Sequence, residues 1–312
     1  MFFSLKEEDF AKYVKELSSS MSLIAPIKGD IARYQYSKDL KDMVFEQPAY
    51  PVNTLLFGKE ETLFTYQKDK ISLPKPPEKT LCFLSRPDTL AFQVLDKLLL
   101  DGPEDRNYRK IRQSLVLVEF AQEDMPAEAF VDKLFLDDNH DAKLIKVTDG
   151  YIIHIRTKKG EALLNRYLEK TAHEPKERKV MNTFLKDMEF KEGKNQEVFD
   201  KHSKTCIACG ACTLTCPTCP CFLVKDIINI KRPDCGKRCR LADSCQFPDF
   251  SDIAGGHEFR ESIADRMRYR VYHKFTDFKK KYGMWMCVGC GRCTRNCPSN
   301  IKLIEILTDL KK

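Results

Sequence analysis

Two hydrophobic patterns alternate along the first half of the chain and predict short strands and helices. Apolar runs rich in β-branched and aromatic residues predict strands at Thr80–Ser85, Leu115–Phe120, Leu144–Val147 and Tyr151–Thr157. Apolar residues at helical spacing predict helices at Glu7–Leu17, Thr89–Leu100 and Gly160–Leu168. Asp88 is a suitable N-cap for the second helix. We therefore expect residues 1–180 to form an α/β domain that docks partners.

The pattern changes in the second half of the chain. Met181–Phe190 predicts a helix that leads into residues 195–312, where short helical segments separate cysteine-containing loops. Ile253–Lys280 predicts a longer basic helical region, with its basic side in solvent. The fold class we expect is α+β, with a mixed α/β domain followed by a mostly helical domain. The second domain carries a cysteine-rich insertion at residues 219–245.

Two cysteine runs in the second domain have the same spacing. They read Cys206-x-x-Cys209-x-x-Cys212-x-x-x-Cys216-Pro217 and Cys287-x-x-Cys290-x-x-Cys293-x-x-x-Cys297-Pro298. This is the spacing of bacterial two-cluster ferredoxins, in which the fourth cysteine of each run ligates the other cluster. The spacing predicts two 4Fe–4S clusters and a protein that transfers electrons. The predicted ligand sets are Cys206, Cys209, Cys212 and Cys297 for cluster one, and Cys287, Cys290, Cys293 and Cys216 for cluster two.

Zinc is the alternative for these cysteines. Structural zinc sites use two separated pairs of ligands, whereas each run here places three cysteines within seven residues. The clusters are therefore favoured, and the iron of these clusters is the metal that we expect.

Five further cysteines lie between the two runs. We expect a third iron–sulfur cluster held by Cys219, Cys221, Cys239 and Cys245, with Cys235 able to replace one of these four. The spacing is irregular, so a zinc site and free or buried thiols remain alternatives.

Composition supports a metal-binding domain over a disulfide-linked one. Of the 14 cysteines, 13 lie within residues 206–297 and only Cys82 lies outside. The amino-terminal segment lacks a signal sequence, and no apolar stretch reaches the ~20 residues of a membrane span. Disulfides are rare in the cytoplasm, so clustered cysteines favour metal there. We expect a cytoplasmic protein.

Positive charge is concentrated in the second domain. The net charge is +7, and residues 201–312 hold 21 Lys and Arg against 11 Asp and Glu. A basic domain can indicate nucleic-acid binding. Here the thiolates of bound clusters would offset part of the excess, so we expect no nucleic-acid partner.

No motif for substrate chemistry accompanies the cysteine runs. The chain lacks the glycine-rich motifs of nucleotide sites, so no flavin or NAD(P) is expected on it. We expect no catalytic residues and no substrate site of its own, which is typical of one component of a larger oxidoreductase.

Residues at and beyond the end of the first cysteine run resemble those of a known family. They are Cys216-Pro-Thr-Cys219-Pro-Cys221-Phe, Asp243-Ser-Cys245, Ala254-Gly-Gly-His257-x-Phe-Arg260 and Asp265-Arg-x-Arg268-x-Arg270-x-x-His273-Lys274. The pattern is similar to that of the electron-transfer subunit of anaerobic sulfite reductase and the β subunit of sulfhydrogenases. The resemblance covers about residues 200–300 strongly and the first half faintly.

The resemblance implies an electron-relaying subunit of an anaerobic hetero-oligomer. Its partners would be a catalytic subunit, either a hydrogenase, a sulfite reductase or a heterodisulfide-reductase-like protein, and a flavin- and NAD(P)-binding subunit. Family members often carry extra cysteines in the first half. Here the matching segments read Arg86-Pro-Asp88 and Ala121-Gln-Glu-Asp-Met-Pro126, so we expect no cluster there.

Two other functions remain open. The chain could reduce sulfur or sulfite by itself, because Cys239-x₅-Cys245 has the spacing of half a sirohaem–cluster motif. It could also be a zinc-bound structural scaffold or nucleic-acid adaptor. A sirohaem absorption band would establish the first, and zinc without iron and sulfide the second.

Overall fold

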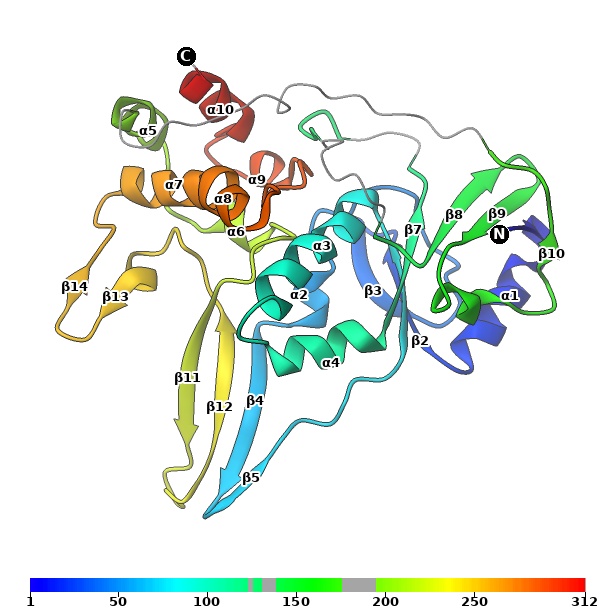
Figure 1. Ribbon diagram of the computed structural model, residues 1–312, viewed down its shortest axis with the longest axis horizontal. Helices are drawn as coiled ribbons and strands as arrows, with labels where there is room; N and C mark the ends of the chain where they lie inside the picture. The colour runs from blue at the N-terminus through cyan, green and yellow to red at the C-terminus, as the bar shows by residue number, and fades with distance from the viewer. Residues whose placement is uncertain (123–125, 131–138, 176–194, 312) are drawn as a thin grey trace. The chain divides into compact units, whose positions relative to one another are not determined.

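The computed structural model describes residues 1–122, 126–130, 139–175 and 195–311 (Figure 1). The predicted helix at Met181–Phe190 lies outside the described residues. The chain forms two compact units. Unit 1 contains residues 1–55, 76–127 and 135–181, and unit 2 contains residues 56–75, 128–134 and 182–312. Residues 56–75, which were expected in the first domain, thus belong to the unit that holds the cysteine runs.

Unit 1 is built on an eight-stranded mixed sheet. The strand order is β10-β1-β9-β8-β7-β6-β2-β3, and the central pairs β2–β6, β6–β7 and β7–β8 are parallel. The strands are β1 (Phe2–Lys6), β2 (Ser22–Ile27), β3 (Arg33–Ser37), β6 (Thr80–Leu84), β7 (Leu115–Phe120), β8 (Ala142–Val147), β9 (Gly150–Ile155) and β10 (Glu169–Lys170). All four predicted strands are present in this sheet, with ends that differ from the prediction by at most two residues.

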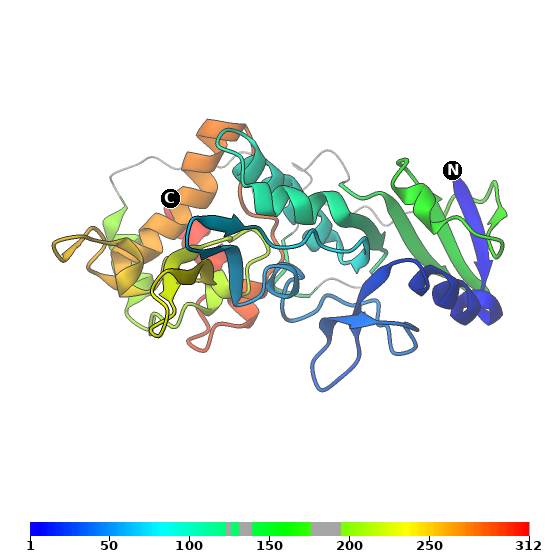
Figure 2. The same cartoon turned by 90° about the horizontal axis from the view of Figure 1, so that it is seen from below.

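Helices cover both faces of the sheet, which explains why β6 and β7 are uniformly buried. Helix α1 (Phe10–Ser18) packs Tyr13, Val14 and Leu17 against one face, together with Leu81 and Phe83. The alternate residues Cys82 and Leu84 face the other side, where α3 (Arg86–Leu100) and α4 (Arg106–Ser114) lie (Figure 2). A short helix, α2 (Asn53–Leu56), lies where the first segment of unit 1, residues 1–55, continues into unit 2.

Two helix predictions in unit 1 were wrong in detail. Helix α3 begins at Arg86, so Asp88 is not its N-cap but a buried first-turn residue that accepts hydrogen bonds from Ser85 Oγ (2.6 Å) and Tyr34 OH (2.7 Å). Residues Gly160–Leu163 form only a short 3₁₀ turn instead of a helix that continues to residue 168. Gly160 at the start of this turn packs directly against the Asp141 carbonyl, where no side chain fits.

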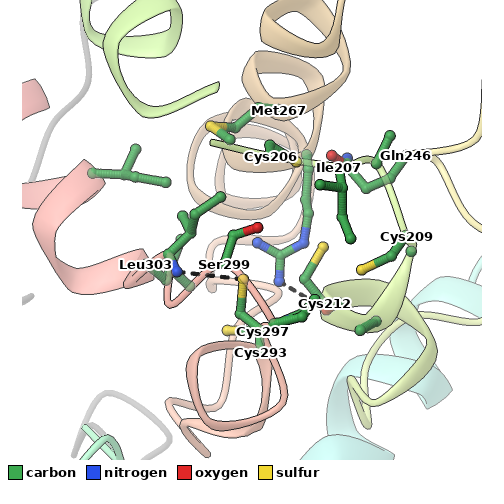
Figure 3. A pocket seen from close by; sticks show the side chains of 17 residues that line it. Cys206, Ile207, Cys209, Cys212, Gln246, Met267, Cys293, Cys297, Ser299 and Leu303 are labelled. Carbon is green, nitrogen blue, oxygen red and sulfur yellow. Dashed lines mark hydrogen bonds between the residues drawn. The ribbon is translucent and has the colours of Figure 1, made fainter. Parts of the chain in front are cut away.

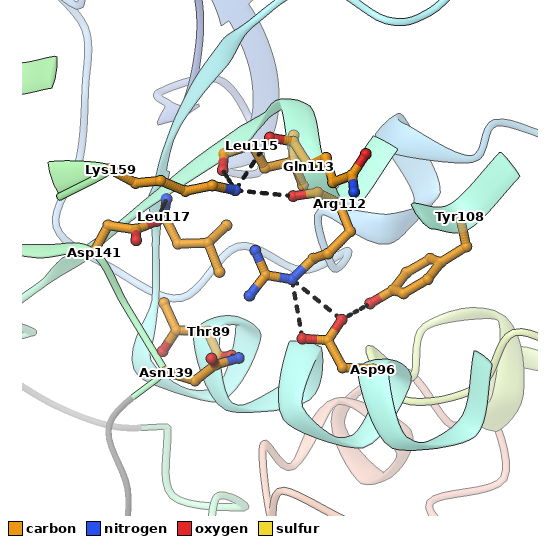
Figure 4. A network of polar contacts seen from close by, with 10 residues as sticks. All are labelled: Thr89, Asp96, Tyr108, Arg112, Gln113, Leu115, Leu117, Asn139, Asp141 and Lys159. Carbon is orange, nitrogen blue, oxygen red and sulfur yellow. Dashed lines mark hydrogen bonds and ion pairs between the residues drawn. The ribbon is translucent and has the colours of Figure 1, made fainter. Parts of the chain in front are cut away.

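Polar contacts fix α3, α4 and the neighbouring strands (Figure 4). The Asp96 carboxylate of α3 accepts hydrogen bonds from Tyr108 OH (2.6 Å) and Arg112 Nε (3.1 and 3.2 Å) of α4. Lys159 Nζ donates to the Gln113 and Leu115 carbonyls (3.1 and 3.2 Å), which lie where α4 ends and β7 begins. These bonds satisfy carbonyls that the end of a helix leaves without partners.

A buried ionic cluster lies at the end of β7. Glu119 is 2% exposed, and its carboxylate oxygens lie 3.3 Å from Arg86 Nη1, Lys143 Nζ and His140 Nδ1. Thr89 Oγ1 also donates to it (3.1 Å). A buried carboxylate needs such compensation, because an unpaired charge is costly in an apolar interior.

Most helices of unit 2 pack around a hydrophobic core that is separate from the core of unit 1. The core brings together Phe199, Met267, Val271, Phe275 and Trp285. The helices are α5 (Gln196–Ser203), α6 (Ala211–Leu214), α7 (Ile263–Tyr272), a π-helical turn (His273–Asp277), α8 (Phe278–Tyr282), α9 (Arg292–Arg295) and α10 (Leu303–Lys311). The predicted helix at Ile253–Lys280 therefore starts ten residues late, because residues 252–258 form the small hairpin β13–β14 (Asp252–Ile253 and His257–Glu258).

Unit 2 also contains a four-stranded antiparallel sheet that the hydrophobic pattern did not predict. Its order is β11-β12-β4-β5, with β11 (Phe222–Ile228), β12 (Cys235–Ala242), β4 (Glu60–Gln67) and β5 (Lys70–Ser72). The cysteine-rich insertion is thus a hairpin, β11–β12, that pairs with a hairpin from the first quarter of the sequence. The predicted α+β class is confirmed. No helix in the described parts of the chain is long and apolar enough to cross a membrane.

Candidate functional site

The two cysteine runs adopt the same loop and helix geometry, 81 positions apart. Gly210 and Gly291 have φ values of 75° and 74° and precede the short helices α6 and α9. Thr213 and Thr294 donate their backbone N–H to these glycines at 3.0 and 3.1 Å. Ala208 and Gly289, at the preceding equivalent position, also have positive φ (53° and 63°). The sequence repeat is therefore a structural repeat.

Both runs contribute cysteines to one cavity (Figure 3). Cys206, Cys209 and Cys212 of the first run and Cys297 of the second line it, as the crossed ligand set for cluster one requires. Cys293 borders the same cavity. Burial raises the pKa of the Cys206 thiol, and the neighbouring thiols of Cys297 and Cys209 raise it further.

The second ligand set also combines residues from the two runs. A hydrogen bond with Cys219, burial and the nearby thiol of Cys290 all raise the pKa of Cys216, the last cysteine of the first run. Burial raises the pKa of Cys287 to about 12, and the nearby thiols of Cys293 and Cys290 act in the same direction. Cys216 thus interacts most strongly with Cys219 of the insertion, and Cys290 of the second run also lies near it.

Two buried cations lie among these thiols. Arg270 on α7 lines the cavity and donates from Nη2 to the Cys212 carbonyl (3.0 Å). Lys274, in the π-helical turn, is 1% exposed and donates to Thr218 Oγ1 (2.9 Å). Burial raises the pKa of both Cys212 and Cys287 to about 12, and the cations act in the opposite direction, Arg270 on the pKa of Cys212 and Lys274 on that of Cys287.

Arg270 supplies the evidence that the cavity suits an anionic, sulfur-rich group. Its Nε is buried and has no hydrogen-bond partner in the part of the chain that the structure describes. A buried N–H group without a partner is costly, and the sulfurs of an iron–sulfur cluster are acceptors for such groups. The four cysteines and this donor therefore fit a 4Fe–4S cluster.

Within the described residues, no three His, Cys, Asp or Glu side chains are grouped as ligands of a single metal ion.

The insertion cysteines fall into two groups. Cys219, Cys221 and Cys245 are linked by thiol hydrogen bonds, Cys219 with Cys221 and Cys221 with Cys245. The hydrogen bond with Cys221 lowers the pKa of Cys245 to about 7.

The remaining two insertion cysteines lie on β12. Cys239 is fully buried, with Sγ 3.5 Å from Glu60 Oε1 and 3.9 Å from Thr62 Oγ1 of β4. Cys235 donates to Asp234 (3.7 Å). The structure therefore brings together three of the four cysteines predicted for a third cluster, and it places Cys239 in the sheet.

Sequence reasoning missed the buried cations. The basic side of the helix was expected to face solvent, but Arg266, Arg270 and Lys274 are 5%, 7% and 1% exposed. Their spacing of four residues places them on one helical face, and this was the signal that could have identified them. Arg266 Nη1 pairs with Glu258 (3.1 Å) and donates to the Arg260 and Glu261 carbonyls.

Comparison with known proteins defines the class to which the chain belongs. Residues 205–301 match the family described as the 4Fe-4S dicluster domain. This range contains both cysteine runs and the hairpin between them, so this part of the chain is similar to domains that hold two 4Fe–4S clusters, which supports an iron–sulfur electron-transfer subunit.

A relative is similar over the whole chain. The chain is 27% identical over 337 aligned positions to sulfhydrogenase 2 subunit beta of Pyrococcus furiosus, and the alignment covers 100% of this chain and 98% of that protein. The predicted resemblance to sulfhydrogenase β subunits is thus confirmed, and it extends through unit 1. No solved structure matches the chain.

Proposed function

We propose that the chain relays electrons between partner subunits through two 4Fe–4S clusters with crossed ligation. Cluster one is held by Cys206, Cys209, Cys212 and Cys297, and cluster two by Cys287, Cys290, Cys293 and Cys216. The observation that carries this proposal is a cavity lined by three cysteines of the first run and by the last two cysteines of the second, Cys293 and Cys297. Each cluster, when bound, accepts and releases one electron.

We propose that Arg270 and Lys274 adjust the reduction potentials of the two clusters. Cluster binding places negative charge where the two buried cations already lie, and their positive charge favours the reduced form of a nearby cluster. Arg270 Nε, which has no partner among the described residues, would be available to donate to a sulfur of cluster one, and Lys274 would place its positive charge beside Cys216 and Cys287.

The partners we propose are a catalytic oxidoreductase subunit together with a flavin- and NAD(P)-binding subunit. The full-length similarity to a sulfhydrogenase β subunit favours a hydrogenase as the catalytic partner over a sulfite reductase or a heterodisulfide-reductase-like protein. Substrate chemistry would take place on the partners, and the complex would work in the cytoplasm.

A third iron–sulfur centre remains part of the proposal. Its ligands would include Cys219, Cys221 and Cys245, whose thiols are in mutual contact. Iron analysis of anaerobically purified protein tests this: about twelve irons per chain are expected, and about eight would show that only the dicluster pair is present.

The crossed ligation is tested by pairs of cysteine substitutions. Residues that serve one cluster should be non-additive, because the first substitution already releases that cluster. We expect Cys216→Ala to lose about four irons, and Cys216→Ala with Cys290→Ala to lose no more than that. Cys216→Ala with Cys209→Ala should lose about eight. The reverse pattern would show that each run holds its own cluster and would refute the crossed sets.

A further inference from the structure

Strand β11 is an edge of the four-stranded sheet in unit 2 and is almost wholly exposed. Among the strands that the structure describes, it pairs with β12 alone. Phe222, Leu223, Val224 and Ile228 are 42%, 52%, 45% and 55% exposed, so apolar side chains on both faces of this strand lie in solvent. Ile230, in the turn that follows, is 95% exposed.

Such an edge is unusual in a protein that works alone. An exposed edge presents a row of backbone N–H and C=O groups that can pair with another strand, and proteins ordinarily protect it with charges, prolines or a covering segment. Residues Phe222–Ile228 include no proline and only two charged residues, Lys225 and Asp226. The edge therefore has the properties of a surface that another strand covers.

The two charges on this edge differ in their partners. Asp226 is already paired, because both of its carboxylate oxygens accept from Arg238 of β12 at 2.7 Å. Lys225 lies opposite Cys239 in the pairing of the two strands, and it has no carboxylate partner among the described residues. An added strand would cover Val224 and Ile228 with apolar side chains and would meet Lys225 with an acidic one.

The root of the hairpin connects this edge to the thiols. Strand β11 begins directly after Cys221, and β12 ends three residues before Cys245. The Asp243 backbone N–H donates to the Cys221 carbonyl (3.0 Å) and closes the base of the hairpin. A strand bound along β11 is therefore joined through one short segment to the insertion thiols.

We propose that β11 is the docking edge for an extended segment of a partner subunit, which adds to the sheet as a fifth strand. The segment is apolar, with an Asp or Glu opposite Lys225. This inference rests on the proposed function, because the occupant is one of the subunits that exchange electrons with this chain. Main-chain hydrogen bonds would supply affinity, and the acidic residue would fix the register.

Hydrogen–deuterium exchange in the anaerobically purified complex tests the docking. The amides of Phe222–Ile228 that face away from β12 should exchange at least tenfold more slowly in the complex than in the full-length chain alone. The amides of β5, the opposite edge of the same sheet, serve as the control and should be unchanged. Equal exchange of β11 in both samples would overturn the inference. Slow exchange in the chain alone that depends on its concentration would show that a second copy covers the edge.

A charge reversal tests the chemistry of the occupant. Lys225→Glu should weaken association with the partner about tenfold, and the loss should be larger at low salt. Lys231→Glu, an exposed lysine in the hairpin turn, is the matched control and should leave association unchanged. Equal effects of the two substitutions would refute the acidic partner strand.

Failure of the inference and failure of the proposed function give different results. A complex that transfers electrons while β11 exchanges freely would refute the docking edge and leave the electron-relay function intact. A chain with a full iron content that co-purifies with no other protein would refute both.

Discussion

Arg270 and Lys274 connect the helix α7 region to both sets of cluster cysteines. Placing two cations in a protein interior costs several kcal/mol for each ion unless negative charge compensates them. Arg270 faces the thiols of Cys212 and Cys293, and Lys274 faces those of Cys216, Cys219 and Cys287. Negative charge at the cysteines would therefore offset the free-energy cost of burying the two cations.

Arg270→Gln should lower the reduction potential of cluster one. Loss of a unit charge near a cluster removes about 3 kcal/mol at ~6 Å and an effective dielectric constant of about 20. For a one-electron couple this corresponds to on the order of 100 mV toward negative values. A redox titration followed by electron paramagnetic resonance would measure it.

Arg268→Gln provides the control for this measurement. Arg268 lies on the same helix but is half exposed and pairs with Asp265. Its replacement should leave the potential within the experimental error. An equal shift in both variants would show that helix stability, and not the buried charge, sets the potential.

Gly291→Ala should destabilise the loop of the second cysteine run. A Cβ atom there would lie 2.6 and 2.7 Å from the backbone of Glu128, and φ is 74°. Gly283 has nearly the same φ, 71°, but open space around it, so Gly283→Ala carries only the backbone strain of about 1 kcal/mol. We expect Gly291→Ala to lose at least about 2 kcal/mol more than Gly283→Ala in chemical denaturation. Similar losses would show that Glu128 can move away.

At the scale of single residues, the ferredoxin cysteines were predictable because their spacing alone indicates that three thiols can surround one cluster. The crossed assignment of Cys216 and Cys297 comes from the same spacing and stays a prediction. Arg270 was not predicted, because a basic residue on a helix is ordinarily in solvent and only its burial beside Cys212 reveals its role.

At the scale of elements, Glu119→Gln should remove a pH-dependent part of the stability of unit 1. Burial opposes ionisation of Glu119, but His140, Arg86 and Lys143 together hold its pKa at about 2. Because this pKa is lower in the folded state than its ordinary value of 4.5, the stabilisation is complete above about pH 4.5 and is lost as pH falls toward 2. It amounts to about 3 kcal/mol at most.

Urea unfolding followed by circular dichroism at pH 7 and pH 3 measures this effect. The difference in unfolding free energy between the native chain and Glu119→Gln should be large at pH 7 and smaller at pH 3. A difference independent of pH would mean that the ionic cluster does not hold Glu119 ionised.

The elements of unit 1 were easier to predict than those of unit 2. Strands β6 and β7 are short apolar runs with both faces buried, and such runs are visible in the sequence. Strands β11 and β12 were missed because Phe222–Ile228 shows no regular alternation and β12 pairs with β4, whose Thr62 lies 177 residues before Cys239. The pattern of residues within one strand does not indicate a pairing with a strand 177 residues away in the sequence.

At the scale of the whole molecule, the interleaved units limit how the chain can be divided. A fragment of residues 195–312 contains all eight ferredoxin cysteines but lacks β4. Its β12 amides should exchange much faster than in the full-length chain, because one neighbour of β12 is gone. The amides of α7, whose core contacts Phe199 and Leu307 remain, should exchange at similar rates in both. Unchanged exchange of β12 would show that β4 contributes nothing to the sheet.

The pairing of β4 with β12 has a consequence for synthesis on the ribosome. The β4–β5 hairpin leaves the ribosome well before its partner strand, since Thr62 precedes Cys239 by 177 residues. At a synthesis rate of ~5–20 residues per second, this hairpin remains with one edge unpaired for on the order of ten to thirty seconds. The four-stranded sheet of unit 2 is therefore completed only after β12, which ends at Ala242, has left the ribosome.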